Sequence, residues 1–251
     1  MSSIRVPLVS AITVVRNGAA TISRTLESVS TQSQVDVEHI IIDGASTDGT
    51  IEIIKAHQRD HLRWISEPDQ GIYDAMNKGV SLARGEWLLF LGTDDVLADP
   101  AVLADIFLER ELASYDLVCG NSSYHGGREC VPRLDWHTLI FNTIHHQAAF
   151  YRRRLFDGFR YRLDIPVVAD YEMNFLIYRQ RRPVLFLDRQ VAISGRYGVS
   201  HTSSQFSGQF DAYRIRGRYV NILLNSVLLA TGLVNLLITR LAGLHTQRKR
   251  P

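Results

Sequence analysis

The first hundred residues alternate between short apolar runs and longer segments in which apolar residues recur at helical spacing. The apolar, β-branched runs predict buried strands at 8–15, 39–42, 62–65 and 87–91. The stripes between them predict helices over 22–29 and 71–83, and between these a helix that carries Ile51 and Ile54. We expect Ser46 or Thr47 to cap the second helix. Strands that alternate with helices indicate an α/β fold with a mostly parallel, Rossmann-like sheet flanked by helices.

The order of elements is less regular after Pro100. Apolar patterns there predict a helix over 102–112, a strand over 117–120 and a helix that starts at Asp170. The sequence contains no evident internal repeat or low-complexity stretch. One domain with a variable second half is therefore the simplest division.

Acidic residues stand at the ends of three successive predicted strands. Asp43 closes the second strand, Asp69 follows the third, and the pair Asp94-Asp95 follows the fourth. Ligands of open parallel sheets bind beyond the carboxyl ends of the strands, where helix N-termini also offer N–H groups. Aspartate is also common in turns, so a single one of these residues carries little information. Their repetition favours a ligand site over a set of turns.

The adjacent carboxylates of Asp94 and Asp95 favour a bound cation. Two ionised carboxylates in one loop repel each other unless a cation or a donor-rich ligand offsets the repulsion. Mg²⁺ or Mn²⁺ takes oxygen ligands, with phosphates and water completing the shell. The alternative is that one of them caps the helix expected near Asp99.

Three segments then resemble the family-2 glycosyltransferases: residues 39–50 (HIIIDGASTDGT), 66–79 (SEPDQGIYDAMNKG) and 85–95 (GEWLLFLGTDD). The resemblance is dense over the first hundred residues and looser over the next hundred. It implies the GT-A fold, a nucleotide-diphosphate-sugar donor that is UDP-linked, a divalent metal, and inversion at the anomeric carbon.

The resemblance also assigns roles within the donor pocket. Asp43 would accept a hydrogen bond from the nucleobase, usually uracil, with Thr13 and Asn17 near the same nucleotide. Asp69 would close the pocket. Asp48 is expected to shape the turn into the following helix rather than to touch the ligand.

The segment Thr93-Asp94-Asp95 stands where the family has its DxD-type motif, with Thr93 in place of the first acid. This implies that Asp94 contacts the ribose or phosphate and that Asp95 binds Mn²⁺ or Mg²⁺.

An acceptor hydroxyl needs a base, because an alcohol is a weak nucleophile until its proton is removed. Asp170 stands where the family carries its catalytic acid, and Glu172 is the rival. The alternative for Asp170 is a charge that only stabilises a helix N-terminus. His146 resembles an acceptor-side residue of the family and is expected to contact the acceptor or the leaving phosphate, although a lone histidine is more often structural. His201, in a loop that resembles the family's closing loop, is a weaker candidate.

Composition narrows the class of protein. The chain has 251 residues, 45% hydrophobic, with 28 basic and 26 acidic residues and a net charge of +2, so the bulk charge indicates no nucleic-acid partner. Basic clusters in the second half suggest either an anionic partner or a solvated surface. Two cysteines without CxxC spacing and a start without a long apolar stretch lead us to expect a cytoplasmic protein.

The segment 219–238 is strongly apolar and approaches the length of about 20 residues that crosses a bilayer. Its polar or small residues fall near one helical face: Asn221, Asn225, Gly232, Asn235 and Thr239. An amphipathic helix of this kind, flanked by basic residues, favours a membrane surface or a partner protein. Core packing and a true span remain alternatives.

Together these features predict a GT-A domain over 1–213, with a nucleotide-binding half (1–100) and an acceptor half (101–213), and a helical tail over 214–251. We expect a metal-dependent, inverting hexosyltransferase that acts on a glycan or lipid-linked acceptor, peripheral on the inner face of the cell membrane. A non-catalytic nucleotide-sugar-binding or scaffold protein of the same fold is the alternative. A phosphatase with paired aspartates is disfavoured, because its nucleophile would follow the first strand, where Arg16-Asn17 stand.

Overall fold

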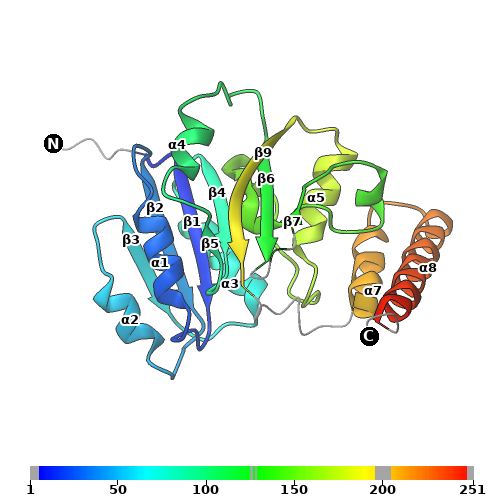
Figure 1. The fold of residues 1–251 in the computed structure, drawn as a ribbon, viewed down its shortest axis with the longest axis horizontal. Coiled ribbons are helices and arrows are strands. Elements are labelled where there is room, and N and C mark those ends of the chain that lie inside the picture. Colours follow the sequence, from blue (N-terminus) through cyan, green and yellow to red (C-terminus); the bar gives the residue numbers. More distant parts are fainter. Residues whose placement is uncertain (1–5, 125–126, 128, 196–204, 248–251) are drawn as a thin grey trace.

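The computed structural model describes residues 6–124, 127, 129–195 and 205–247 (Figure 1). The strands are β1 (Val9–Val15), β2 (Val37–Asp43), β3 (Leu62–Ser66), β4 (Trp87–Leu91), β5 (Val96–Leu97), β6 (Leu117–Tyr124), β7 (Glu129–Cys130), β8 (Ala149–Arg152) and β9 (Val184–Ser194). The α-helices are α1 (Ile22–Ser30), α2 (Thr50–Ala56), α3 (Ile72–Leu82), α4 (Val102–Phe107), α5 (Asp170–Arg179), α7 (Gln205–Arg216) and α8 (Ile222–Gln247). Short 3₁₀ helices are η1 (Trp136–Leu139), η2 (His146–Ala148) and η3 (Arg153–Phe156).

One twisted sheet joins the strands in the order β3-β2-β1-β4-β8-β6-β9-β5, with β7 on β6. The first four strands along this order are all parallel, so their carboxyl ends meet at one edge. Antiparallel pairing of β4 with β8 and of β8 with β6 then attaches the second half of the chain. The α/β class is thus confirmed, and the parallel part is the half that the sequence pattern described best.

The predicted strands of the first half are confirmed within two residues at each end, but two helix predictions are corrected. Neither Ser46 nor Thr47 caps α2, which begins at Thr50 after Gly49. Gly49 has φ 95°, a conformation that suits glycine, and the Asp48 carboxylate accepts the Thr50 N–H at 3.1 Å. The helix expected over 102–112 ends at Phe107, and residues 108–111 beyond it are exposed.

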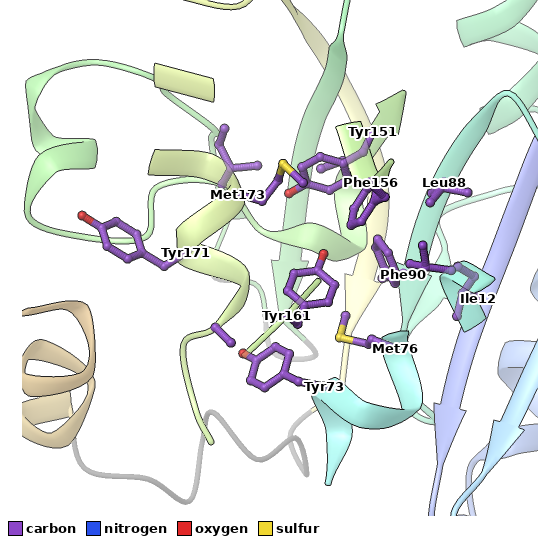
Figure 2. Packing of buried hydrophobic residues seen from close by; sticks show 14 of the residues in the cluster. Ile12, Tyr73, Met76, Leu88, Phe90, Tyr151, Phe156, Tyr161, Tyr171 and Met173 are labelled. Atoms are coloured by element: carbon purple, nitrogen blue, oxygen red, sulfur yellow. The ribbon is translucent and has the colours of Figure 1, made fainter. Parts of the chain in front are cut away.

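A hydrophobic cluster joins the two halves (Figure 2). Tyr73 and Met76 of α3 and Phe90 of β4 come from the first half, while Tyr151 of β8 and Tyr161 come from the second. Ring centroids lie 5.5 Å apart for Tyr73 and Tyr161 and 5.7 Å apart for Phe90 and Tyr161. Aromatic pairs at such separations bury large areas, so the halves share one core.

The helices α7 and α8 lie side by side at the end of the molecule beyond α5 (Figure 1). The expected division at 213/214 falls inside α7, whose Ile215 is fully buried in the shared core. Tyr219 and Val220 also pack against that core.

Candidate functional site

A cavity of about 320 Å³ lies at the carboxyl edge of the parallel strands. The end of β1, the start of α3 and the turn after β4 line it, through residues that include Arg16, Asp69, Gly71, Thr93 and Asp94. Because β1 pairs in parallel with both β2 and β4, the segments that follow these strands reach the same edge. Asp69 and Asp94, which the sequence placed at successive strand ends, are brought together here.

The turn after β4 presents Asp94 and buries Asp95. Asp95 is 4% exposed, and its carboxylate accepts N–H bonds from Gly92 at 2.7 Å and from Gly195 at 3.3 Å. Burial raises the pKa of Asp95, the neighbouring Asp94 charge adds to this effect, and the two N–H bonds oppose it. The Thr25 hydroxyl donates to the Asp95 carbonyl at 2.7 Å, which fixes the turn against α1.

Gly195, at the end of β9, closes over this turn. A Cβ at this position would lie 1.8 Å from Oδ2 and 2.4 Å from Cβ of Asp94, so only glycine fits here without displacing the turn. The acceptor half therefore holds the paired carboxylates in place.

Asp43 is fully buried at the end of β2. Its carboxylate accepts the Ser46 N–H at 2.9 Å, the Ser66 hydroxyl at 2.6 Å, and the Ser46 hydroxyl. Asn17 lies beside the same loop, where its side-chain oxygen accepts the Thr47 N–H at 2.9 Å. The loop that follows β2 is thus tied to both residues expected near the nucleobase.

Thr13 is not brought into this group. It is fully buried within β1, and its hydroxyl bonds to Nε2 of His39 at 2.9 Å. Burial, with a smaller effect from His61, lowers the pKa of His39 to about 3, so the Thr13 partner is a neutral imidazole. This pair belongs to the interior of the sheet.

Asp69 lines the cavity, and its carboxylate accepts the Gly71 N–H at 2.9 Å. The other carboxylate oxygen lies against Gly44, where a Cβ would approach it to 2.3 Å. Close approach of the loops after β2 and β3 therefore depends on glycine at position 44.

Asp48 shapes the turn before α2, as predicted. Its carboxylate accepts the Thr50 hydroxyl at 2.5 Å and the Ala19 N–H at 3.0 Å, and these bonds lower the pKa of Asp48. It therefore links the loops after β1 and β2.

Asp170, the first residue of α5, accepts three side-chain hydrogen bonds. Tyr73 donates through its hydroxyl at 3.0 Å, Asn142 through Nδ2 at 2.8 Å, and His146 contacts it through Nδ1 at 3.1 Å. Burial of Asp170 opposes ionisation, but these donors outweigh it, His146 first, so the pKa of Asp170 lies below its usual value. The group is a carboxylate at neutral pH.

His146 interacts with both acidic centres. Burial alone would lower its pKa, yet the hydrogen bond and charge of Asp170, and then the charge of Asp95, raise it above the usual value. An imidazolium at this point interacts favourably with both carboxylates.

Asn142 is itself oriented by a chain of buried polar groups. Asn174 Nδ2 donates to the Asn142 side-chain oxygen at 2.8 Å, and the Tyr151 hydroxyl donates to the Asn174 oxygen at 2.9 Å. With its oxygen engaged, Asn142 can present only its NH₂ group to Asp170.

Glu172, the rival base, points elsewhere. It is 1% exposed and accepts bonds from Tyr219 at 2.5 Å and from Arg218 at 3.3 Å, at the junction before α8. The geometry therefore favours Asp170.

A second cavity, of about 510 Å³, lies in the acceptor half. Asn142, which donates to Asp170, forms part of its wall, together with Arg133, Phe141 and His145. Its lining mixes apolar and polar side chains.

Sequence reasoning missed Arg16, Tyr73 and Asn142. Arg16 follows a strand end directly, and Tyr73 lies inside the segment 66–79, so both had a positional signal. Asn142 had none, because its role arises from contacts with residues 28 and 32 positions away. The loop with His201 lies outside the described residues.

The paired carboxylates fit a divalent cation. Burial and the neighbouring Asp94 charge both disfavour the ionised form of Asp95, and a hard cation would offset both effects. Within the described ranges, no three His, Cys, Asp or Glu side chains converge on one point. Among the described residues a cation held by Asp95 would therefore find few further protein ligands, and phosphate and water would complete its shell.

Comparisons with known proteins agree with this geometry. A sequence model described as "Glycosyl transferase family 2" matches residues 10–181. A "PGL/p-HBAD biosynthesis glycosyltransferase" of Mycobacterium bovis is 37% identical over 179 residues, 67% of this chain and 68% of that protein.

Solved structures support the GT-A fold. S. aureus TarS 1–349 in complex with UDP-GlcNAc has a TM-score of 0.66 at 19% identity, over 90% of this chain and 71% of that one. Mannosyltransferase PcManGT from Pyrobaculum calidifontis, in complex with GDP-Man and Mn²⁺, has a TM-score of 0.65 at 18% identity, over 91% and 70%.

Proposed function

The chain belongs to glycosyl transferase family 2, and on that premise we propose that it is a metal-dependent, inverting hexosyltransferase. The donor is a nucleotide-diphosphate sugar, UDP-linked, and the acceptor is a hydroxyl of a glycan or lipid-linked molecule. The observation that carries the proposal is the position of His146, which hydrogen-bonds to Asp170 and interacts electrostatically with Asp95. One imidazole thus couples the candidate base to the candidate diphosphate site.

Asp170 removes the acceptor proton. As the hydroxyl oxygen forms its bond to the anomeric carbon, its proton passes to the Asp170 carboxylate, and the bond from that carbon to the phosphate oxygen breaks. Attack from the face opposite the leaving nucleoside diphosphate inverts the anomeric carbon. Three donors to Asp170 weaken it as a base, so its contribution depends on being held in line with the acceptor.

The donor occupies the cavity at the carboxyl edge of the parallel strands. Asp94, which lines this cavity, would contact the ribose or phosphate, and the adjacent Asp95 would hold Mn²⁺ or Mg²⁺. The ion would offset the charge of the diphosphate. Arg16, which lines the cavity, adds positive charge near the leaving group, and any positive charge on His146 would act in the same sense. Asp69 closes the mouth. Complexes of the structural neighbours with UDP-GlcNAc and with GDP-Man and Mn²⁺ support a donor of this class.

The nucleobase lies over the loop after β2. Asn17 and Asp43 are both tied to this loop, and a nucleobase N–H would bind Asp43 in exchange for a serine hydroxyl. Thr13 has no such opportunity, because it is buried against His39.

The acceptor enters the larger cavity, whose wall contains Asn142. A hydroxyl presented from this side meets Asp170 next to the amide that orients it. Mixed apolar and polar lining suits a molecule that carries both a sugar and an apolar portion.

The test separates donor binding from transfer. Calorimetry with UDP and MnCl₂ measures binding, and UDP release from a panel of UDP-sugars measures turnover. We expect Asp170→Asn to bind UDP as the wild type does and to lose turnover by about 10²–10⁴-fold, whereas Asp95→Asn loses the manganese-dependent part of UDP binding.

Glu172→Gln is the matched control for Asp170 and should keep its turnover if it stays folded, since its carboxylate faces the α8 junction. Turnover like that of the wild type in both aspartate variants would remove the mechanism. UDP binding without release for any acceptor would favour the non-catalytic alternative, and retention at the anomeric carbon, seen by NMR of the product, would exclude inversion.

A further inference from the structure

One side of α8 exposes a continuous series of large apolar side chains. The members, each between 45% and 77% exposed, are Ile222, Leu223, Leu224, Val227, Val234, Leu237, Ile238 and Leu241. Within the segment 222–241, the most apolar window of 18 residues has a mean hydropathy of 2.0, and only 17% of that window is buried. We call this surface the α8 apolar face. It far exceeds the scattered apolar residues that are normal on a soluble surface.

The opposite side of α8 packs on the protein, and it carries polar and small residues. Asn225 is 1% exposed, accepts Nε of Arg216 at 3.1 Å and donates to the Tyr213 carbonyl at 2.9 Å. Gly232 sits against Gln209, where a Cβ would come within 2.3 Å of the amide oxygen. Two members of the polar stripe seen in the sequence thus contact the protein, which turns the apolar side outward.

The charge of the C-terminal segment indicates the kind of partner that covers the α8 apolar face. Residues 212–251 contain seven basic residues and no acidic one, and since the whole chain is +2, the remainder is −5. Arg214 and Arg218 already pair with acidic groups of the body, and Arg216 is buried. The exposed Arg240 and the sequence Arg248-Lys249-Arg250 supply the remaining charge.

We propose that the α8 apolar face docks this protein on an anionic lipid bilayer, with α8 lying in the plane of the interface. In this arrangement the side chains of the α8 apolar face enter the boundary between headgroups and acyl chains. The basic residues toward the C-terminus attract acidic headgroups. A span is disfavoured, because it would carry the polar contacts of Asn225 with α7 into hydrocarbon or break them. A second copy of this chain is disfavoured as the partner of the α8 apolar face, because the two α8 segments would both be basic and would repel each other.

The location fits a lipid-linked acceptor. α8 lies at the end of the molecule that carries the acceptor half, remote from β3 and α2 at the other end (Figure 1). Docking through α8 does not depend on the proposed transfer reaction, so the two can fail separately.

Flotation of the full chain with vesicles tests the proposal. The vesicles are phosphatidylcholine with and without phosphatidylglycerol, and we expect recovery mainly with the anionic mixture. The triple substitution Leu223→Gln, Val227→Gln and Val234→Gln removes three exposed apolar side chains, and it should reduce recovery at least about tenfold.

The matched control is Val6→Gln, Leu108→Gln and Phe186→Gln, which removes three exposed apolar side chains elsewhere and should float as the wild type does. Replacing Arg240 and the three terminal basic residues with Gln should reduce recovery on the anionic vesicles by at least about tenfold. Circular dichroism and UDP release should stay unchanged in the first variant.

Equal flotation of the α8 variant and the wild type would overturn the proposal. So would resistance to alkaline carbonate extraction, which marks a span, or a dimer seen by light scattering that the α8 variant dissociates without any vesicle binding.

Discussion

The two halves of the catalytic domain build their parts of the site in different ways. In the donor half, four parallel strands end at one edge of the sheet. Their parallel pairing brings the residues that follow them to the same cavity. In the acceptor half, the strands are mixed, and Asp170 is placed by bonds from Tyr73, Asn142 and His146. Strand pairing in the sheet therefore determines the position of the donor cavity, whereas side-chain contacts between distant segments determine the position of Asp170.

Gly195 and Tyr73 each contact an acidic residue of the opposite half. Gly195 of the acceptor half closes on Asp94 and donates to Asp95, and Tyr73 of the donor half donates to Asp170. Each half therefore completes the site of the other, which makes these contacts the places where the comparison can be tested.

The largest effect is expected at Gly195. In Gly195→Ala the new Cβ would overlap Asp94, so the paired carboxylates must move. Displacement of about 1 Å in such a site costs about a hundredfold in kcat/KM, measured as UDP release with saturating manganese. Gly158→Ala is the control, because a Cβ there has open space, and it should keep its activity. Equal activity in both variants would mean that the acceptor half does not hold the donor carboxylates.

A second prediction concerns the interior of the donor half. The pKa of His39 is lowered to about 3 in the fold against an ordinary 6.5, so below pH 6.5 the unfolded chain binds a proton that the native imidazole does not. Stability is therefore lost as pH falls from about 6.5 towards about 3, by about 2 kcal/mol between pH 7 and pH 5.

Urea unfolding at the two pH values measures this loss, and His39→Gln should lose about 2 kcal/mol less than the wild type does over the same interval. Identical pH dependence in the two proteins would show that His39 takes up its proton within the fold.

The smallest effect is expected at Tyr73. Tyr73→Phe removes one donor to Asp170, which raises the pKa of that carboxyl, so the acidic limb of the kcat profile moves to higher pH. At acidic pH the rate should fall about tenfold, with little change on the plateau. Tyr161→Phe alters the neighbouring ring without a hydrogen bond to Asp170 and is the control. A profile that shifts equally in both variants would point to packing rather than to the hydroxyl.

The sequence predicted the donor half well because one rule covers many of its residues. Apolar runs located β1 to β4, and the positions just after them located Asp69 and Asp94 in one cavity. The same rule could not show that Thr13 faces inward against His39, since a buried strand gives no signal for which polar side chain points to a ligand.

The acceptor half was predictable only through its motif. Asp170 was singled out by resemblance. The contacts of Asn142 and Glu172 could not be read from the sequence, because they join the segment between η1 and η2, α5 and the segment before α8. The orientation of α8 also escaped prediction. A polar stripe on a helix normally faces solvent, and only the bonds of Asn225 show that it faces the protein here.

The hydroxyl of Tyr73 has a consequence for building chimeras. This residue belongs to α3, yet its hydroxyl donates to the proposed base at position 170. A hybrid joined at residue 100 would take position 73 from one parent and position 170 from the other. The hydrogen bond between these two residues would then depend on whether the parents match. Positions 73 and 170 are therefore best inherited together, so a transplanted acceptor half should bring α3 with it.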